Sequence, residues 1–322
     1  MPVNRSDVIW AYRTFLGREP ENDDVVDLHC RAADFRSLCE SFIGSNEFKI
    51  LSAASAKAGG LAPPPVLMAR LPIDTSADPD QLRCLWERVR RAWEGLGERR
   101  PFHSVLTQDR FLPSRLSDSE KQFWETGEIE ARHLADYLAG GDHIELAAAT
   151  VLEFGCGVGR VAIPLAAASG RVVAYDISEP HLTLGRARAA ALGRTNIRMS
   201  AIGDALPDDF EACDVFYSRI VLQHNPPPII GLVLQKLIRA LKPGGMGIFQ
   251  VPTYGVGYSF NLREFLRSPQ PHDMEMHCFP QAELFSLVAQ AGARLVEVRE
   301  DDAPGRRDLF ISNNFVIRKN TA

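Results

Sequence analysis

Long hydrophobic runs, closely spaced cysteine pairs and an excess of basic residues are all missing from this chain of 322 residues. No stretch approaches the roughly 20 consecutive apolar residues of a membrane-spanning helix, so we expect no membrane span. The first residues lack the apolar core of a secretory signal, and we therefore expect a cytoplasmic protein. A formal net charge of -5 argues against nucleic acid as a partner.

Cysteine usage gives no sign of a disulfide or zinc framework. None of the six cysteines forms a C-x-x-C pair, and we expect reduced thiols in core or loop positions. One polar cluster, His272, Asp273, Glu275 and His277, superficially resembles a set of metal ligands. Such a segment is more often a polar loop before a helix, so we predict no bound metal.

A glycine-rich turn is the most informative feature that is present. Residues 151–160 read V-L-E-F-G-C-G-V-G-R, an apolar strand that runs into Gly155, Gly157 and Gly159. Glycines let the backbone turn sharply and admit a ligand against the main chain, and the following helix offers free amide groups. A dinucleotide-binding turn, G-x-G-x-x-G, would carry glycine where this chain has Arg160, which disfavours a nicotinamide-dependent dehydrogenase.

Four further segments follow this turn in an order that resembles the class I S-adenosylmethionine-dependent methyltransferases, whose first motif has the form E-x-G-x-G-x-G. They are R-V-V-A-Y-D-I-S at 171–178, I-G-D-A-L-P at 202–207, C-D-V-F-Y-S-R-I-V-L-Q-H at 213–224 and L-K-P-G-G at 241–245. The resemblance implies a methyltransferase with S-adenosylmethionine as cofactor. It also implies an α/β fold with a Rossmann-like seven-stranded sheet, mostly parallel with an antiparallel last strand.

The resemblance further implies which residues hold the cofactor. Asp176, at the end of the second strand, would bind both ribose hydroxyls, and Asp204 with the next amide, of Ala205, would meet the adenine. Arg219 is either a partner of the methionine carboxylate of the cofactor or a surface charge. The full expected set is Glu153, Phe154, Gly155, Cys156, Gly157, Gly159, Asp176, Ile177, Asp204, Ala205 and Arg219.

Hydrophobic periodicity agrees with this architecture, because a parallel sheet buried on both faces needs nearly continuous apolar runs separated by helices. Strands are expected at 150–154, 171–176, 196–201, 213–219 and 246–251. Helices are expected at about 159–168, 179–192, 228–241 and 281–292. Two last strands, at 294–299 and 313–319, predict an antiparallel hairpin, whereas a dehydrogenase would more often continue with a parallel unit.

Four regions are predicted along the chain. They are a small helical module at 1–52, a linker rich in alanine and proline at 53–80, a helical extension or lid at 81–145, and a catalytic domain that binds S-adenosylmethionine at 146–322. The segments A-Y-R-T-F-L-G-R-E-P (11–20) and F-R-S-L-C-E-S-F-I-G-S-N-E-F (35–48) resemble a small helical module related to phycobilisome linkers, which implies self-association or a protein partner. A plain packing or dimerisation element is the alternative.

The helical extension is the candidate for closing the site over the cofactor. Phe123, Trp124 and Gly127 lie within it and are the residues expected to help close the site. The alternative is that the two aromatic residues belong to the core, as buried aromatic pairs on helices more often do.

His224 is the candidate catalytic residue. Methyl transfer to a hydroxyl needs a base that takes the proton, and histidine suits that task near neutral pH. His224 follows the fourth strand at its carboxyl end, where open α/β sheets bind their ligands. The alternative is that His224 orders this loop or lines the cofactor pocket.

The acceptor site is expected just after the fifth strand. Tyr254, Tyr258 and Phe260 suit stacking on a sugar face or another flat ring, and His277 is a further candidate for touching substrate. Together with the N-terminal module they favour O-methylation of a sugar or glycan, or of another small-molecule hydroxyl; they could instead be loop anchors. Two other functions stay open: a methyltransferase-fold scaffold without catalysis, and an NAD-dependent oxidoreductase.

Overall fold

The chain divides into two compact units, Met1–Arg70 and Leu71–Ala322. The computed structural model describes residues 3–16, 18–45, 47–49, 71–140, 144–268, 273–302, 304–305 and 309–321. Most of the predicted linker, at 53–70, and His272 of the polar cluster lie outside the described residues.

The first unit is helical. Its elements are α1 (Arg5–Ala11), a π-helical turn (Tyr12–Leu16), α2 (Asp23–His29) and α3 (Phe35–Gly44). Side chains of Asn4, Asn22 and Asp34 accept hydrogen bonds from amides in the first turns of α1, α2 and α3, so each helix begins at a capping residue. The role predicted for this unit in association stays a prediction.

The second unit contains one seven-stranded sheet in the order β3-β2-β1-β4-β5-β7-β6. Its strands are β1 (Thr150–Phe154), β2 (Arg171–Asp176), β3 (Ile197–Ala201), β4 (Cys213–Ser218), β5 (Leu241–Gly255), β6 (Ala293–Asp301) and β7 (Phe310–Lys319). The first five strands are parallel, and β7 runs antiparallel to both β5 and β6. The predicted fold is confirmed, including its antiparallel end.

The fifth strand is longer than the sequence predicts. It begins at Leu241 because the expected turn at 241–245 forms an irregularity in the pairing with β4, between Cys213 and Val215. It extends to Gly255 because β7 pairs with it along that whole length.

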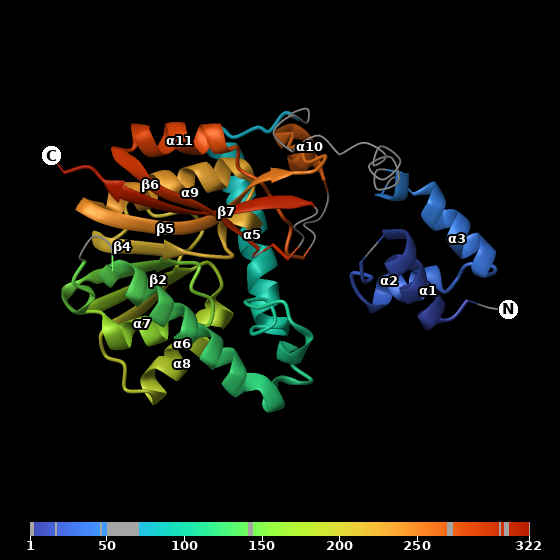
Figure 1. Cartoon of the computed structure of the whole chain (residues 1–322), viewed down its shortest axis with the longest axis horizontal. Coiled ribbons are helices and arrows are strands. Elements are labelled where there is room, and N and C mark those ends of the chain that lie inside the picture. Colours follow the sequence, from blue (N-terminus) through green and yellow to red (C-terminus); the bar gives the residue numbers. More distant parts are fainter. Residues whose placement is uncertain are drawn as a thin grey trace. The chain divides into compact units, whose positions relative to one another are not determined.

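Helices cover both faces of the sheet (Figure 1). On one face lie α9 (Pro227–Ala240) and α11 (Gln281–Gln290), and on the other α6 (Leu116–Gly140), α7 (Ala162–Ala168) and α8 (Glu179–Ala191). The adjacent β1 residues Val151 and Leu152 are fully buried. Val151 packs in the core on the side of α6 and α7, and Leu152 packs in the core on the side of α9 and α11. Within the described ranges, no helix is both long and apolar enough to cross a membrane.

Residues 71–80 belong to the second unit, so the predicted linker at 53–80 is too long at its C-terminal end. Ile73 forms a β-bridge with Phe260, and Oδ2 of Asp74 accepts a hydrogen bond from the Leu262 amide at 2.8 Å. This amide belongs to the first residue of α10 (Leu262–Arg267), and the nearby helix α5 (Pro79–Arg99) begins at a capping box formed by Asp78 and Gln81.

Candidate functional site

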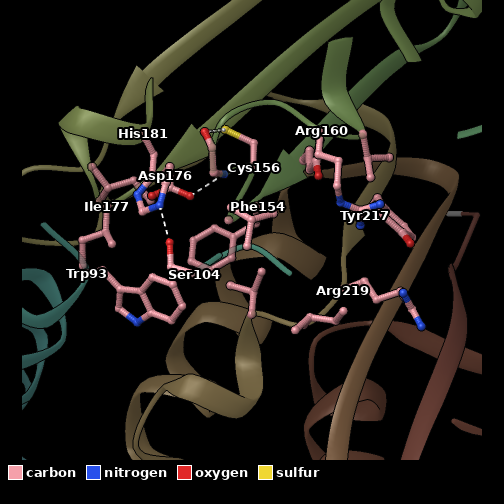
Figure 2. A pocket seen from close by; sticks show the side chains of 18 of the residues that line it. Trp93, Ser104, Phe154, Cys156, Arg160, Asp176, Ile177, His181, Tyr217 and Arg219 are labelled. Atoms are coloured by element: carbon pink, nitrogen blue, oxygen red, sulfur yellow. Dashed lines mark hydrogen bonds between the residues drawn. The ribbon is translucent and has the colours of Figure 1, made fainter. Parts of the chain in front are cut away.

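A pocket opens at the carboxyl ends of β1, β2 and β4 and encloses about 820 Å³, part of it open to solvent. Figure 2 shows Asp176, His181 and Ser104 at one end and Arg160, Tyr217 and Arg219 at the other. The predicted residues that line it are Glu153, Phe154, Gly155, Cys156, Gly157, Asp176, Ile177 and Arg219.

The glycine turn forms one wall of this pocket. Gly155, Gly157 and Gly159 all have positive φ angles, of 78°, 54° and 78°, which disfavour any residue with a side chain. A Cβ atom on Gly155 would also lie 2.4 Å from the Val221 side chain. Gly159 does not line the pocket, and a Cβ atom there would stand 2.9 and 3.0 Å from the side chains of Ile163 and Met199, so only glycine fits at this point of the turn; its contact with the cofactor stays a prediction.

Asp176 joins the end of β2 to this turn. Its Oδ2 accepts a hydrogen bond from the Gly157 amide at 2.7 Å, and its Oδ1 accepts one from the Ser178 amide at 2.8 Å. The carboxylate is buried yet lines the pocket. Because each carboxylate oxygen has a further lone pair, Asp176 can still accept hydrogen bonds from ligand hydroxyls.

Glu153 is a buried acid on the same wall. Burial raises its pKa well above the usual value, with the nearby Glu130 and Asp176 adding to the effect and Arg160 opposing it. Its Oε2 has no hydrogen-bond partner among the described residues. A carboxyl group in this position is suited to receive a cationic ligand group, which would both pair with it and favour its ionised form.

A layer of charged side chains closes the opposite end of the pocket. Glu130 of α6 accepts hydrogen bonds from Arg160 at 2.6 Å and from the Tyr217 hydroxyl at 2.7 Å. Burial would raise the pKa of Glu130, but Arg160, Arg219 and Tyr217 together hold it below the usual value. Arg219 lies between Glu130 at 3.4 Å and Asp301 at 3.3 Å, so its charge is already shared by two carboxylates.

A buried histidine ties the helical extension to α8, and the sequence prediction missed it. Nδ1 of His181 lies 2.7 Å from the Ser178 hydroxyl, and Nε2 lies 2.8 Å from the Ser104 hydroxyl. Ser104 in turn donates to the Pro101 carbonyl, which leaves its oxygen to accept from Nε2–H of His181. Burial lowers the pKa of His181, so this neutral arrangement persists at neutral pH.

Comparisons with known proteins agree with this geometry. Residues 151–245 match a family model described as a methyltransferase domain. The chain is 26% identical over 230 residues to a ubiquinone biosynthesis O-methyltransferase of Ruegeria pomeroyi, covering 69% of this chain and 85% of the relative. Residues 151–245 thus form a methyltransferase domain, and the comparisons support the predicted class I S-adenosylmethionine-dependent methyltransferase.

Two further comparisons concern a second relative and a solved structure with a similar fold. A ubiquinone biosynthesis O-methyltransferase of Paraburkholderia phytofirmans is 26% identical over 235 residues, covering 70% of this chain and 87% of the relative. The crystal structure of magnesium protoporphyrin IX methyltransferase from Synechocystis PCC 6803, with bound SAH, superposes with a TM-score of 0.52 at 16% identity. That match covers 73% of this chain and 99% of the other, and it supports the fold.

Asp204 and Ala205 do not line this pocket, and their contacts with the adenine stay a prediction. The Asp204 side chain is 96% exposed and lies 3.5 Å from Arg90 of α5. The loop is held because the Trp86 indole N–H donates to the Gly203 carbonyl at 2.9 Å. Ile202, which the sequence prediction missed, lines the pocket instead.

His224 lies beside the pocket, behind Trp93. The two ring centroids are 5.2 Å apart, and Trp93 rather than His224 lines the pocket wall. Nδ1 of His224 lies 3.0 Å from the Glu275 carbonyl, and Nε2 lies 3.2 Å from Nε2 of Gln223. Burial lowers the pKa of His224 to about 4; the hydrogen bond to the Glu275 carbonyl opposes this shift, and the nearby His277 adds to it.

The residues expected to touch the acceptor lie away from the pocket wall. The Tyr258 hydroxyl is 3.0 Å from Nδ1 of His277, and burial raises the pKa of this tyrosine. Phe260 is 4% exposed and packs on Phe265 and His277. Tyr254 sits within β5, at the end of its pairing with β7. The segment after β5 folds back onto residues 71–74, and the predicted contacts of these residues with the acceptor stay a prediction.

The acidic members of the metal-like cluster are paired with arginines of the helical extension. Asp273 lies 2.6 Å from Arg100, and Glu275 lies 3.2 Å from Arg88. Among the described residues, which exclude His272, no three potential ligands come together.

The helical extension lines the pocket with residues other than Phe123 and Trp124, whereas Gly127 packs directly against the turn at Arg160. Phe123 and Trp124 pack with Phe102 in a separate aromatic core. The pocket wall instead receives Trp86, Val89, Trp93, Ser104, Val105 and Glu130. Trp86, Val89 and Trp93 recur three and four positions apart, so they share one face of α5.

Proposed function

We propose that this methyltransferase transfers a methyl group to a hydroxyl oxygen of a small molecule. The observation that carries the proposal is one pocket that combines the glycine turn, the buried acid Asp176 and Oε2 of Glu153, which has no hydrogen-bond partner among the described residues. The names of the relatives from Ruegeria pomeroyi and Paraburkholderia phytofirmans favour oxygen over nitrogen or carbon as the methylated atom.

Each end of the pocket suits one part of S-adenosylmethionine. Asp176 would accept the ribose hydroxyls, and the apolar side chains of Ile177 and Ile202 would flank the adenine. Glu153 would pair with the ammonium group of the methionine portion. Since Arg219 is shared by Glu130 and Asp301, the predicted contact with the methionine carboxylate requires it to accept a third anionic partner.

The sulfonium supplies an already activated methyl group, so the protein contributes position and exclusion of water. Val105 lies over Gly157, where a Cβ atom would stand 2.8 Å from its side chain, and Trp93 and Val89 extend this apolar cover. The helical extension is therefore proposed as the lid of the site.

His224 is proposed as the group that takes the hydroxyl proton. The Glu275 carbonyl can only accept, so Nδ1 of His224 carries the hydrogen and Nε2 carries the lone pair that a base needs. That lone pair accepts from Nε2 of Gln223 at 3.2 Å, so the acceptor hydroxyl must replace this bond before proton transfer. A pKa near 4 makes it a weak base. Proton transfer must then be late, after the new carbon–oxygen bond has made the hydroxyl acidic.

The expectation of a sugar or glycan acceptor relied on Tyr258, Phe260 and His277. These side chains pack against one another, so they do not support that expectation. The pocket wall next to His224 is formed by Trp93, Ile220 and Val221. This apolar surface favours a flat, largely apolar molecule that carries a hydroxyl.

Calorimetric titration of the cofactor-free protein with S-adenosylhomocysteine, with NAD in parallel, tests the cofactor. Saturable binding of S-adenosylhomocysteine alone is expected, and binding of NAD alone would refute the proposal. A methyl-transfer screen with phenols, catechols and nucleotide sugars then tests the acceptor. Cofactor binding with no transfer to any hydroxyl compound would favour the scaffold alternative.

A further inference from the structure

A continuous chain of hydrogen bonds crosses the interior beside the pocket. The Ile220 amide donates to Oε1 of Gln250 at 3.0 Å, and Nε2 of Gln250 donates to Oε1 of Gln223 at 2.9 Å. Nε2 of Gln223 then lies 3.2 Å from Nε2 of His224, whose Nδ1 lies 3.0 Å from the Glu275 carbonyl. The chain therefore joins β5, the loop after β4 and the segment before α11.

Main-chain groups fix the direction of every bond in this chain. The Ile220 amide can only donate, so Gln250 must turn its oxygen to it and its NH₂ group to Gln223. The Glu275 carbonyl can only accept, so His224 must carry its hydrogen on Nδ1 and accept at Nε2. The two requirements meet without conflict at the bond from Gln223 to His224, and only one arrangement of hydrogens satisfies all four bonds.

Gln250 is the central member of the chain. It is fully buried in the middle of β5, where an apolar residue would be the ordinary choice, and its second amide hydrogen is donated to the Ser312 hydroxyl at 2.7 Å. Ile220, which it holds, has a φ of 58°, a conformation that β-branched residues rarely adopt, and lines the pocket. Strain of this kind persists only where neighbours enforce it.

We propose that Gln250 is a positioning residue of the transfer site. It holds Ile220 in its left-handed conformation against the pocket and, through Gln223, keeps the lone pair on Nε2 of His224. The second consequence rests on the proposed role of His224 as proton acceptor, whereas the first does not.

Gln250→Glu is the informative variant. A carboxylate still accepts from the Ile220 amide but cannot donate to Gln223. The Gln223 amide is then expected to turn over, so that its NH₂ faces residue 250 and its oxygen faces His224. Because an oxygen beside Nε2 favours a hydrogen there while Glu275 keeps one on Nδ1, His224 should become protonated at a higher pH.

The measurement is the NMR titration of the His224 ring nitrogens, assigned by comparison with His224→Gln. The surrounding titratable groups are His277, Glu275 and the Arg88 that is ion-paired with Glu275. The titration midpoint should rise by one pH unit or more in Gln250→Glu, on the order of a tenfold change in proton affinity. Ser312→Ala, which removes only the side branch of the chain, should leave the midpoint unchanged.

Adding Gln223→Met to Gln250→Glu separates two effects on His224: the relay, which is the change passed on through the hydrogen bonds of Gln223, and the direct effect of the new charge at position 250. Methionine keeps the shape of glutamine but cannot take the place of its amide in these hydrogen bonds. Most of the shift should disappear in this double variant, and a shift that persists in full overturns the relay. If Gln250→Glu does not fold, the unaltered protein decides: an Nε2–H tautomer of His224 overturns the proposal, and Nδ1–H supports it. No acceptor or cofactor is needed, so these outcomes are independent of whether methyl transfer is found.

Discussion

Gly127, in the middle of α6, lies so close to the glycine turn that a Cβ atom there would stand 1.9 Å from the carbonyl oxygen of Arg160. Neither partner can yield easily, because one is a helix backbone and the other is the main chain of the turn that lines the pocket. The helical extension is thus fitted directly onto the site at this point.

Gly127→Ala should destabilise the protein although alanine is the better helix former. Forcing a methyl group into this contact should cost about 1–3 kcal/mol, which outweighs the roughly 1 kcal/mol gained in helix propensity. Affinity for S-adenosylhomocysteine should fall as well, because the turn must shift. Gly140→Ala, at the end of the same helix with no atom within 4 Å, is the matched control. Equal urea denaturation midpoints for the two variants would contradict the prediction.

Glu153→Gln should raise the stability of the protein and weaken its binding of S-adenosylhomocysteine. The pKa of Glu153 is raised in the folded state, so folding loses free energy as pH rises above the usual value and the unfolded chain ionises. The glutamine variant escapes this loss and should melt higher than the unaltered protein at pH 7–8, by about 2–4 °C per kcal/mol recovered. The gain should vanish near pH 4.

The same variant should bind S-adenosylhomocysteine more weakly, because a neutral amide cannot pair with an ammonium group. Calorimetry at pH 7.5 and thermal melts across the pH range test the two halves separately. Unchanged affinity would move the ammonium group away from Glu153, and a lower melting temperature at pH 8 would mean that Glu153 is ionised and stabilised in the cofactor-free protein.

Asp176→Asn and Asp204→Asn should differ sharply. Asn has a single acceptor oxygen, so at position 176 one of the amides of Gly157 and Ser178 loses its partner and the ribose site loses its charge. Affinity for S-adenosylhomocysteine should fall about tenfold or more. Asp204 is exposed and away from the pocket, so its variant should keep the affinity. A loss at Asp204 instead would show that its loop moves onto the adenine when cofactor binds.

The sheet and the glycine turn could be predicted from the sequence because their signals are local. Apolar runs such as Val151 and Leu152 and the spacing from Gly155 to Gly159 depend only on neighbouring residues. Contacts between distant segments left no such signal. Ser104 and His181 form a hydrogen bond although they lie 77 positions apart in the sequence, and neither their residue types nor their spacing predicts this contact.

The same limit explains why the predicted acceptor residues do not line the pocket. Tyr258 and Phe260 follow a strand end, where exposed aromatics are typical of binding sites, but Ile73 pairs with Phe260 and covers this segment. Asp204 had the expected sequence neighbours, yet Arg90 of α5 draws it outward. In both cases an element more than 100 residues away decides where the side chain lies.

His224→Gln tests the proposed base. Removal of a general base typically lowers the rate about 10²–10⁴-fold, so kcat should fall by that order while affinity for S-adenosylhomocysteine is kept. His133→Gln, an exposed residue on α6, is the control and should leave both unchanged. Normal turnover of His224→Gln would leave this histidine with a role in ordering the loop only.

Acid stability gives a second test of His224 that needs no acceptor. The folded-state pKa of about 4 lies below the ordinary value of 6.5, so the unfolded chain binds a proton first as the pH falls. Folding free energy attributable to His224 is therefore fully present above about pH 6.5 and is lost as the pH falls toward 4. His224→Gln has no such proton to bind, so its free energy of unfolding should decline less between pH 7 and 4. Parallel urea curves for both proteins at each pH would mean that His224 titrates normally in the fold, and that its ring is reached by water.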